Sequence, residues 1–180
     1  MSIKIEDGAG SGKLASVSDN QRLRTTSVSS PRAYYVSRDD GQTYSWTSSY
    51  SAATGEEIIY IKNTDTERKL FIDIMRFSAV NTALFEVYEV TGTASGTAIT
   101  GKNLNLSSGS VADATSYGNN AVTGLTIGDR ITLVRVPANG VHDVNFENAI
   151  ILGFNDAIAV TYTGSTGIAD IAIRAFFEEV

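Results

Sequence analysis

The sequence contains no cysteine, only two prolines and a single histidine, His142. Without cysteine the chain can form no disulfide and no thiolate metal site, and a thiol nucleophile is excluded. A single histidine also excludes multi-histidine metal sites. No apolar run approaches the roughly 18 residues that cross a membrane, and the first residues do not resemble a signal peptide. We therefore expect a soluble protein, made in the cytoplasm, with no membrane partner.

Basic residues are in the minority: 14 Lys and Arg stand against 20 Asp and Glu, which gives a formal net charge of −6. Nucleic-acid affinity rests mainly on Lys and Arg that neutralise phosphates, so we expect no nucleic-acid partner. The charge is uneven, because residues 13–38 carry five basic side chains and only one acidic one before Asp39. This basic stretch can meet an acidic protein surface or a phosphate backbone, and the overall acidity favours the protein surface.

Residues 1–33 are rich in Gly, Ser, Thr, Asn and Asp, and their few apolar side chains are scattered singly. Such a segment cannot bury a core of its own. It is either a disordered tail or an arm that orders, strand-like, against a partner. In the second case the candidate partner-binding residues are the apolar and basic ones: Ile3, Ile5, Lys13, Leu14, Val17, Arg22, Leu23 and Arg24.

Short segments rich in β-branched and aromatic residues follow, separated by Gly, Asn, Asp or Pro. They cover residues 57–63, 69–77, 84–90, 130–136, 149–152, 157–162 and 168–177. No window shows a sustained helical period between helix caps. The pattern predicts an all-β fold, an antiparallel β-sandwich that is jelly-roll-like. We expect two parts: an extended N-terminal arm over residues 1–33 and a β-sandwich domain over residues 34–180.

Two polar segments interrupt these strands. Residues 47–55 are small and polar, and we predict a loop there. Residues 91–128 are rich in Gly, Ser, Thr and Asn, and we predict short strands or a long surface loop. Long loops in compact domains are often interaction surfaces.

The predicted strand over residues 69–77 is apolar on both alternating sets of positions. One set is Leu70, Ile72 and Ile74, and the other is Phe71, Met75 and Phe77. Something must cover the second face, either loops of the partner sheet, the 91–128 segment or a neighbouring subunit. The last alternative makes Phe71, Met75 and Phe77 an oligomer contact, and we predict a homotrimer.

Five aromatic residues crowd a polar region, Tyr34, Tyr35, Tyr44, Trp46 and Tyr50. Flat rings can stack on sugars, which makes Tyr44, Trp46 and Tyr50 candidate glycan contacts. The favoured interpretation is that they anchor the junction between arm and domain or fill a subunit interface, where Tyr and Trp are enriched.

Catalytic motifs are incomplete throughout the sequence. Residues 7–14 approach the P-loop pattern, but Asp7 replaces the first glycine and Leu14 the magnesium-binding hydroxyl residue. His142 lies in a turn-like stretch, and no G-x-S-x-G motif occurs. Aspartates such as Asp65 and Asp113 leave a hard-cation site open, although no EF-hand loop is present. We expect a protein that is not an enzyme, with no catalytic residue, cofactor or metal.

The sequence resembles a group of tailed-phage virion proteins in several short motifs. Residues 4–15 contain a Gly-Ser-Gly-Lys arm, and Asn20-Gln-Arg-Leu23 follows as an Asn-Arg-Leu-like step that Gln21 interrupts. Residues 60–65, 85–92 and 172–179 are similar to later landmarks of the group. Together these motifs span most of the chain.

The resemblance implies a structural protein of the virion, such as a capsid decoration (cement) protein. In that role the arm would lie across neighbouring major capsid subunits, and the sandwich would stand on the capsid exterior as a homotrimer. Such a clamp stabilises the head by bridging subunits, without chemistry. The alternative is a tail or fibre accessory module that binds a receptor or carbohydrate.

Overall fold

The computed structural model describes residues 5–6, 14–17, 23–24, 34, 36–37 and 41–179. The chain divides into two compact units, Met1–Pro31 and Arg32–Val180. In the first unit, strands β1 (Ile5–Glu6), β2 (Leu14–Val17) and β3 (Leu23–Arg24) form a small antiparallel sheet in the order β1-β2-β3. That this segment extends along a partner stays a prediction.

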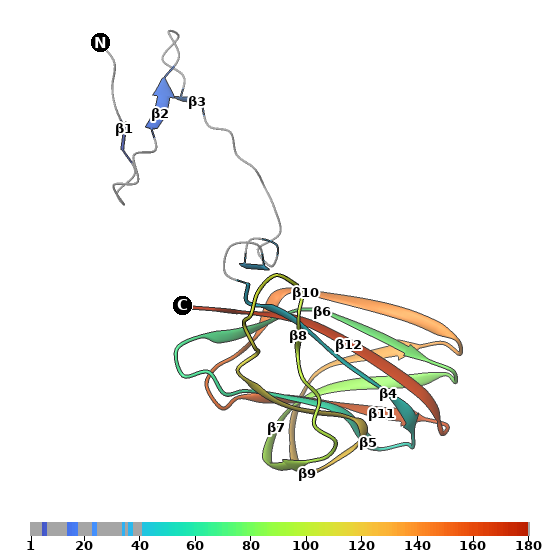
Figure 1. Cartoon of the computed structure of the whole chain (residues 1–180). Coiled ribbons are helices and arrows are strands. Elements are labelled where there is room, and N and C mark those ends of the chain that lie inside the picture. The colour runs from blue at the N-terminus through green and yellow to red at the C-terminus, as the bar shows by residue number, and fades with distance from the viewer. Residues whose placement is uncertain are drawn as a thin grey trace. The chain divides into compact units, whose positions relative to one another are not determined.

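The second unit is built from two antiparallel sheets that pack against each other (Figure 1). One has the order β10-β6-β12-β4-β8, and the other joins β11, β5, β9 and β7 into a closed ring. The strands are β4 (Thr43–Ala52), β5 (Glu56–Asn63), β6 (Lys69–Ala79), β7 (Ala83–Ser95), β8 (Lys102–Asn103), β9 (Ala114–Val136), β10 (Gly140–Leu152), β11 (Ala157–Gly164) and β12 (Gly167–Glu178).

Successive long strands alternate between the two sheets. From β4 the chain crosses to the other sheet at every step except the one from β7 to β9, which are neighbours in the ring. This alternation of eight strands is the jelly-roll arrangement. The prediction of an antiparallel, jelly-roll-like β-sandwich is therefore confirmed.

Strand β9 is long enough to pair with two different strands, β5 and β7, which closes the second sheet into a ring. Its first part, up to Val122, pairs with β5, and its second part, from Thr123, pairs with β7. Strands β7 and β9 approach each other closely at Gly92 and Gly124, both of which have positive φ. A Cβ added to Gly124 would lie 2.2 Å from the carbonyl oxygen of Thr93. Residues 91–128, for which short strands or a long surface loop were predicted, contain the end of β7, the short β8 and the first part of the long β9, with irregular residues between these strands.

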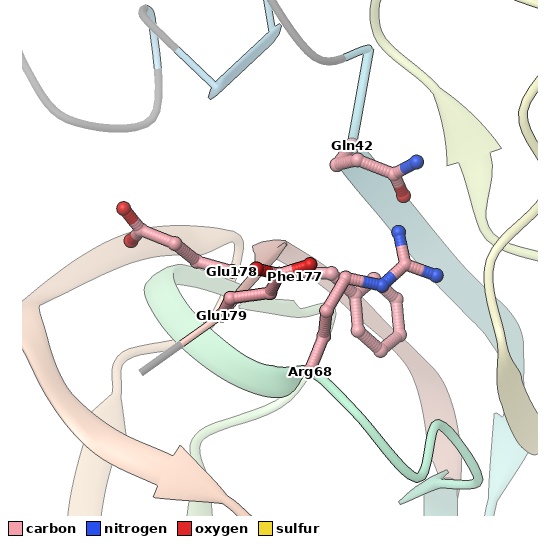
Figure 2. A pocket seen from close by; sticks show the side chains of 5 residues that line it. All are labelled: Gln42, Arg68, Phe177, Glu178 and Glu179. Atoms are coloured by element: carbon pink, nitrogen blue, oxygen red, sulfur yellow. The ribbon is translucent and has the colours of Figure 1, made fainter. Parts of the chain in front are cut away.

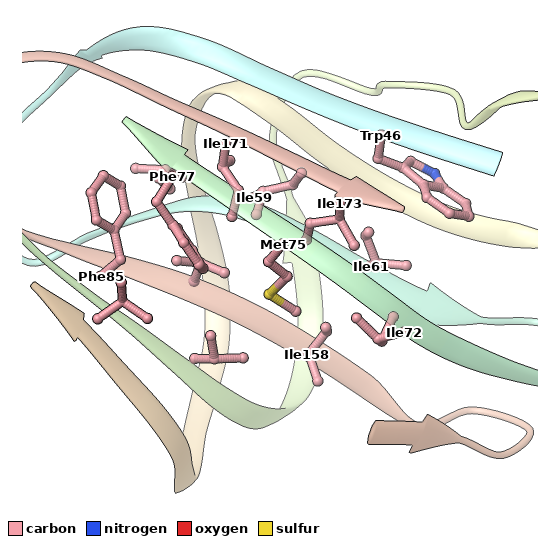
Figure 3. Packing of buried hydrophobic residues seen from close by; sticks show 14 of the residues in the cluster. Trp46, Ile59, Ile61, Ile72, Met75, Phe77, Phe85, Ile158, Ile171 and Ile173 are labelled. Carbon is pink, nitrogen blue, oxygen red and sulfur yellow. The ribbon is translucent and has the colours of Figure 1, made fainter. Parts of the chain in front are cut away.

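The core lies between the sheets and takes large side chains from both of them (Figure 3). Its largest fully buried members are Trp46, Tyr44, Tyr162, Phe77, Phe85 and Phe177. Rings meet at favourable angles, with Phe85 edge-on to Tyr162 at 5.7 Å between centroids. A smaller cluster around Tyr60 and Val90 fills the ring of the second sheet.

A bulge in β6 explains why both of its alternating sets of positions are apolar. On β12, Arg174 pairs with Ile74 and Ala175 pairs with Ile72, so Asp73 has no partner residue there. The extra residue shifts the alternation by one. Leu70 and Ile72 before the bulge and Met75 and Phe77 after it therefore all face the core, where each is fully buried.

The predicted oligomer contact is corrected by this geometry. Met75 and Phe77 lie inside the sandwich, as Figure 3 shows, and no surface of them is exposed. Phe71 faces the other way, but it stacks on Phe176 at 5.3 Å and both pack with Val36. The chain itself thus covers all three side chains.

The predicted loop over residues 47–55 is also wrong, because β4 runs through Ala52. Its inward positions are Tyr44, Trp46, Ser48, Tyr50 and Ala52, of which only Tyr50 is not fully buried. The Ser48 hydroxyl donates to the carbonyl oxygen of Ile58 at 2.7 Å and accepts from the backbone N–H of Asn119 at 2.7 Å. These bonds tie β4 to the opposite sheet.

Candidate interaction surface

The outward side of the five-stranded sheet, here called the outer face, carries mostly polar side chains between its two ends. Register places its residues in rows across strands β10, β6, β12 and β4. Its small side chains are Ser45, Thr47, Ser49, Ser51, Ser78 and Ala172. Side chains of this size leave the backbone of the sheet open to close approach.

Two long side chains in the middle of the outer face, Arg76 and Arg174, form ion pairs. Arg76 donates two hydrogen bonds of 2.7 Å to the carboxylate of Asp143. Arg174 binds one carboxylate oxygen of Asp73, the bulge residue, from Nε at 2.7 Å and from Nη2 at 2.6 Å. The hydrogen bonds from Arg76 lower the pKa of Asp143 and keep it ionised. Each of the two guanidinium groups thus has a carboxylate partner on the same face.

A third carboxylate of this face accepts hydrogen bonds from hydroxyl groups. Asp170 accepts hydrogen bonds from the Ser49 hydroxyl on one oxygen and from the Ser78 hydroxyl, at 2.9 Å, on the other. These bonds link β12 to both neighbouring strands. Each charged group in the middle of the outer face thus has a partner within the same face.

A shallow hollow of about 230 Å³ lies between the two arginines. Its lining residues are Ser45, Ile74, Arg76, Asp143, Ala172 and Arg174. The hollow exists because Ser45 and Ala172 are small where their neighbours in sequence and register are long. It can accept a protruding side chain from another surface.

One end of the outer face is apolar and exposed. Val80, which follows β6, lies beside Ile168 there, and Val141 of β10 is in register with Ser78; the exposed fractions of the three are 47%, 49% and 63%. The backbone N–H of Val80 bonds the carbonyl oxygen of Ile168 at 3.0 Å, which places the two strands side by side. At the opposite end, Phe71 and Phe176 are covered by Val36.

A larger hollow of about 530 Å³ opens beside the start of β4 and the end of β12, and Figure 2 shows it. It is lined by Gln42, Arg68, Phe177, Glu178 and Glu179. The Arg68 guanidinium lies 5.5 Å from the centre of the Phe177 ring, a cation–π distance. Arg68 also pairs with Asp65 and Asp113, so its charge is already balanced from within the domain.

Asp65 organises the turn that carries Arg68. Its carboxylate accepts hydrogen bonds from the backbone N–H groups of Glu67 at 2.8 Å and Arg68 at 2.9 Å, and from the Arg68 side chain at 2.6 Å. Burial alone would raise the pKa of Asp65, but these hydrogen bonds and the Arg68 charge outweigh it and lower the pKa below its ordinary value of 3.8.

The lowered pKa of Asp65 predicts a pH-dependent stability. The ionised side chain stabilises the fold above about pH 4, and this contribution is lost as the pH falls through the lowered value. We expect Asp65→Asn to cost about 1–3 kcal/mol in free energy of unfolding at pH 7, and the difference to shrink in acid. Urea unfolding at several pH values measures it, with Asp129→Asn, exposed on β9, as the control. A deficit that stays constant down to pH 2 would contradict the assignment.

The sequence-predicted contacts of the arm are only partly described. Ile3, Lys13 and Arg22 lie outside the described residues. The rest, Ile5, Leu14, Val17, Leu23 and Arg24, are strand residues of the small sheet, of which the backbone pairing is described: Ile5 with Ala15, Glu6 with Leu14, Val17 with Leu23 and Ser16 with Arg24.

The predicted glycan or interface aromatics are not a surface cluster. Tyr44 and Trp46 are fully buried in the core, with their ring centroids 6.0 Å apart, and offer no ring face to a sugar. Tyr50 is half-buried, and its hydroxyl donates to Glu56 at 3.3 Å. The polar sequence around these residues misled the interpretation, because the polar positions face outward while the aromatic ones face the core.

The acidic side chains and the single histidine were also compared with the requirements of a metal site. There, no group of three or more His, Asp or Glu side chains is placed to hold a metal ion. His142 is exposed on strand β10 rather than in a turn. Among the described residues, no helix is long and apolar enough to cross a membrane.

The outer face was missed by sequence reasoning, although its signal is present. Ser45, Thr47, Ser49 and Ser51 alternate with the buried residues of β4, a period of two that small polar residues disguise. Comparison with known proteins adds no assignment, because no protein-family model and no curated protein matches the sequence. The function is therefore argued from the sequence and the geometry.

Proposed function

We propose that the protein is a structural component of a tailed-phage particle, a capsid decoration protein that binds major capsid subunits through residues 1–33 and stabilises the head. The observation that carries the proposal is the organisation of the chain. The chain divides into a short N-terminal unit, Met1–Pro31, and a second unit that holds the jelly-roll-like domain. The same N-terminal residues carry the Gly-Ser-Gly-Lys resemblance to virion proteins.

The character of the domain supports a passive role. Its charged side chains pair with one another, as Arg76 does with Asp143 and Arg130 with Glu86 at 2.6 Å. Such pairing leaves side chains fixed rather than poised for proton transfer. Jelly rolls are frequent in viral particles, although this fold also serves lectins and enzymes and does not by itself decide function.

The charge distribution supports an outward-facing domain. From Gly41 to the end, eight Lys and Arg stand against fifteen Asp and Glu, whereas the basic residues predominate between Lys13 and Arg38. An acidic surface is repelled by packaged DNA and suits the capsid exterior. A basic arm suits an acidic patch on the capsid shell. The major capsid protein is thus the proposed partner.

The homotrimer of the sequence prediction loses its main support, because Met75 and Phe77 are core residues. It stays a prediction. The alternative of a carbohydrate-binding tail or fibre module loses its support in the same way, since Tyr44 and Trp46 are buried.

Co-sedimentation with capsids tests the proposal. The capsids are assembled from the major capsid protein encoded in the same genome and mixed with the full chain or with a chain lacking residues 1–33. We expect the full chain to pellet with the capsids and the truncated chain to lose at least about tenfold in affinity, because the arm supplies one of two linked contacts.

A full-length variant separates the arm's charge from its length. Lys13→Glu, Arg22→Glu and Arg24→Glu together should weaken capsid binding and abolish its salt dependence. The control reverses Lys62, Lys69 and Arg135 on the domain to glutamate, which changes the net charge equally. Capsid binding that is the same for the full and truncated chains would overturn the role of the arm, and failure of the full chain to bind would overturn the proposed function.

A further inference from the structure

The segment between strands β8 and β9 holds an exposed leucine in an ordered loop. We infer that residues 103–111, here called the Leu106 loop, form the domain's own contact with the major capsid protein, the second of two linked contacts after the arm. In this contact Leu106 fills an apolar recess of the capsid surface, beside the acidic patch that the arm binds. The inference rests on the proposed function, and its test distinguishes the failure of one from the failure of the other.

The Leu106 loop is bonded to the chain just after the arm. The side-chain amide of Asn103 donates to the carbonyl oxygen of Gly41 at 2.7 Å, and that of Asn105 donates to the carbonyl oxygen of Ser37 at 2.9 Å. Ser37 follows the last arm residue, residue 33, by four positions, and a chain of that length spans at most about 14 Å in any conformation. A surface that holds the end of the arm is therefore within reach of the loop.

Leu106 is exposed to solvent and contributes little to the core of the domain. Its exposed fraction is 81%, the highest of any large apolar side chain among the described residues, and that of Val111 in the same loop is 67%. Residues 103–112 contain no Lys, Arg, Asp or Glu. The centres of protein interfaces are likewise depleted of charged side chains. The exposure and the composition of the loop thus fit a site that is buried when a partner binds.

Hydrogen bonds within the loop fix its shape around Leu106. The carbonyl oxygen of Asn105 accepts from the backbone N–H of Ser108 at 2.9 Å, which closes a turn with Leu106 at its second position. Before this turn, Oδ1 of Asn103 accepts from the backbone N–H of Asn105 at 2.9 Å. After it, the Ser108 hydroxyl accepts from the backbone N–H of Ser110 at 3.1 Å. A loop that is ordered before binding loses less conformational entropy when it docks.

The base of the loop is attached to the sandwich. Asn103 of β8 is in register with Tyr44 of β4, and the backbone N–H of Leu104 donates to the carbonyl oxygen of Thr43 at 2.8 Å. A partner that grips Leu106 is therefore connected through a few hydrogen bonds to a central sheet of the domain. The loop can hold the domain against the capsid, which the arm alone does only through the chain that follows it.

The two contacts require different chemistry of the partner. The arm is basic, so its binding to an acidic patch weakens as salt screens the charges. The loop is uncharged, so its contribution comes from apolar surface that leaves water and does not weaken with moderate salt. We therefore expect the chain without residues 1–33 to keep a weak capsid affinity that is insensitive to salt between 50 and about 300 mM.

Co-sedimentation of the full chain with capsids tests the inference. Leu106→Ser should lower the capsid affinity about tenfold, because burying a leucine side chain is worth at least about that factor. In the chain without residues 1–33, the same substitution should abolish the remaining salt-insensitive binding. Leu106 is so exposed that the substitution should leave the fold intact, which circular dichroism and the thermal midpoint establish.

Val141→Ser is the matched control. Val141 is 63% exposed, but it pairs with Ser78, near the far end of β6. Tyr44, beside the Leu106 loop, is level across β12 with Ile72, six residues earlier on β6. The control therefore removes a comparable apolar side chain at a distance from the loop, and it should change the capsid affinity by less than about twofold.

Chemical protection gives a second measurement that does not depend on affinity. The chain has no cysteine, so Leu106→Cys introduces a single thiol at the tip of the loop. Its alkylation by N-ethylmaleimide should slow at least about tenfold when the chain is bound to capsids, because a thiol buried in the contact is inaccessible. The thiol of Val141→Cys should react at the same rate with and without capsids.

The outcomes separate the inference from the proposed function. A wild-type chain that fails to bind capsids would overturn both. Capsid binding that Leu106→Ser leaves unchanged, or a thiol in Leu106→Cys that stays reactive on the capsid, would overturn the inference alone. Equal losses in Leu106→Ser and Val141→Ser would also contradict it. So would a free chain that self-associates through Leu106 in sedimentation equilibrium, because the loop would then join copies of this chain.

Discussion

Trp46→Ala is expected to lower the free energy of unfolding of the domain by about 3–5 kcal/mol. The indole is fully buried between the sheets, and its removal leaves a cavity that the surrounding strands cannot fill. Urea unfolding followed by circular dichroism measures the loss. Phe154→Ala is the control, because Phe154 is 53% exposed, and it should change stability by no more than about 0.5 kcal/mol.

The packing around Trp46 allows a second measurement on the same site. A Cβ added to Gly101 would lie 2.5 Å from the indole ring, so Gly101→Ala should cost about 1–3 kcal/mol through overpacking. The smaller ring of Trp46→Phe makes room for the added methyl group, so the double variant should be more stable than the sum of the two single effects predicts. Strict additivity, or a Trp46→Ala effect below about 1 kcal/mol, would contradict this account of the core.

Deletion of Asp73 is expected to abolish stable folding of the domain. Without the bulge residue, β6 cannot keep Leu70 and Ile72 and also Met75 and Phe77 in the core, and one pair must turn outward. Exposing two such side chains costs about 3–6 kcal/mol, which is comparable with the whole stability of an ordinary domain. The far-ultraviolet circular dichroism and the urea midpoint of the purified chain report the outcome.

Asp73→Ala is the matched control for this deletion. It removes the ion pair with Arg174 but keeps the number of residues in β6 and therefore the bulge. Arg174 is partly exposed and stays hydrated when unpaired, so the cost should be about 1 kcal/mol or less. A deletion variant as stable as Asp73→Ala would show that the register of β6 does not depend on the bulge.

The same bulge marks a limit of sequence reasoning. Strict alternation along the strand predicts that Phe71, Met75 and Phe77 share one face. The prediction of a subunit contact at these residues was based on that alternation. Asp73 was the clue, as an acidic residue within an apolar strand, but the number of residues opposite it on β12 depends on tertiary pairing. Composition and strand spacing, by contrast, were sufficient for the class of fold, because each strand is bounded by turn-forming residues.

Strand β4 shows a different limit. Its inward side includes Ser48, whose buried hydroxyl group makes two hydrogen bonds. One of them comes from the backbone N–H of Asn119, about 70 positions away in the sequence. A serine at an inward position interrupts the apolar alternation that signals a strand. The outer face was overlooked for the same reason, because small polar residues make up its β4 strand.

The domain and the N-terminal segment thus differ in the kind of evidence that supports each of them. The sandwich is explained by its core, its bulge and its ion pairs. The proposed role of residues 1–33 rests on their sequence.

The most direct test of the proposed function is the heat stability of capsids. Capsids are heated with the full chain, with the chain lacking residues 1–33 or alone, and their disassembly temperature is followed by light scattering. The full chain should raise this temperature by several degrees, because binding to the assembled shell alone stabilises it. The truncated chain should not. An equal rise with both chains, or no rise with the full chain at saturating concentration, would contradict the proposal that the arm fastens a stabilising protein to the head.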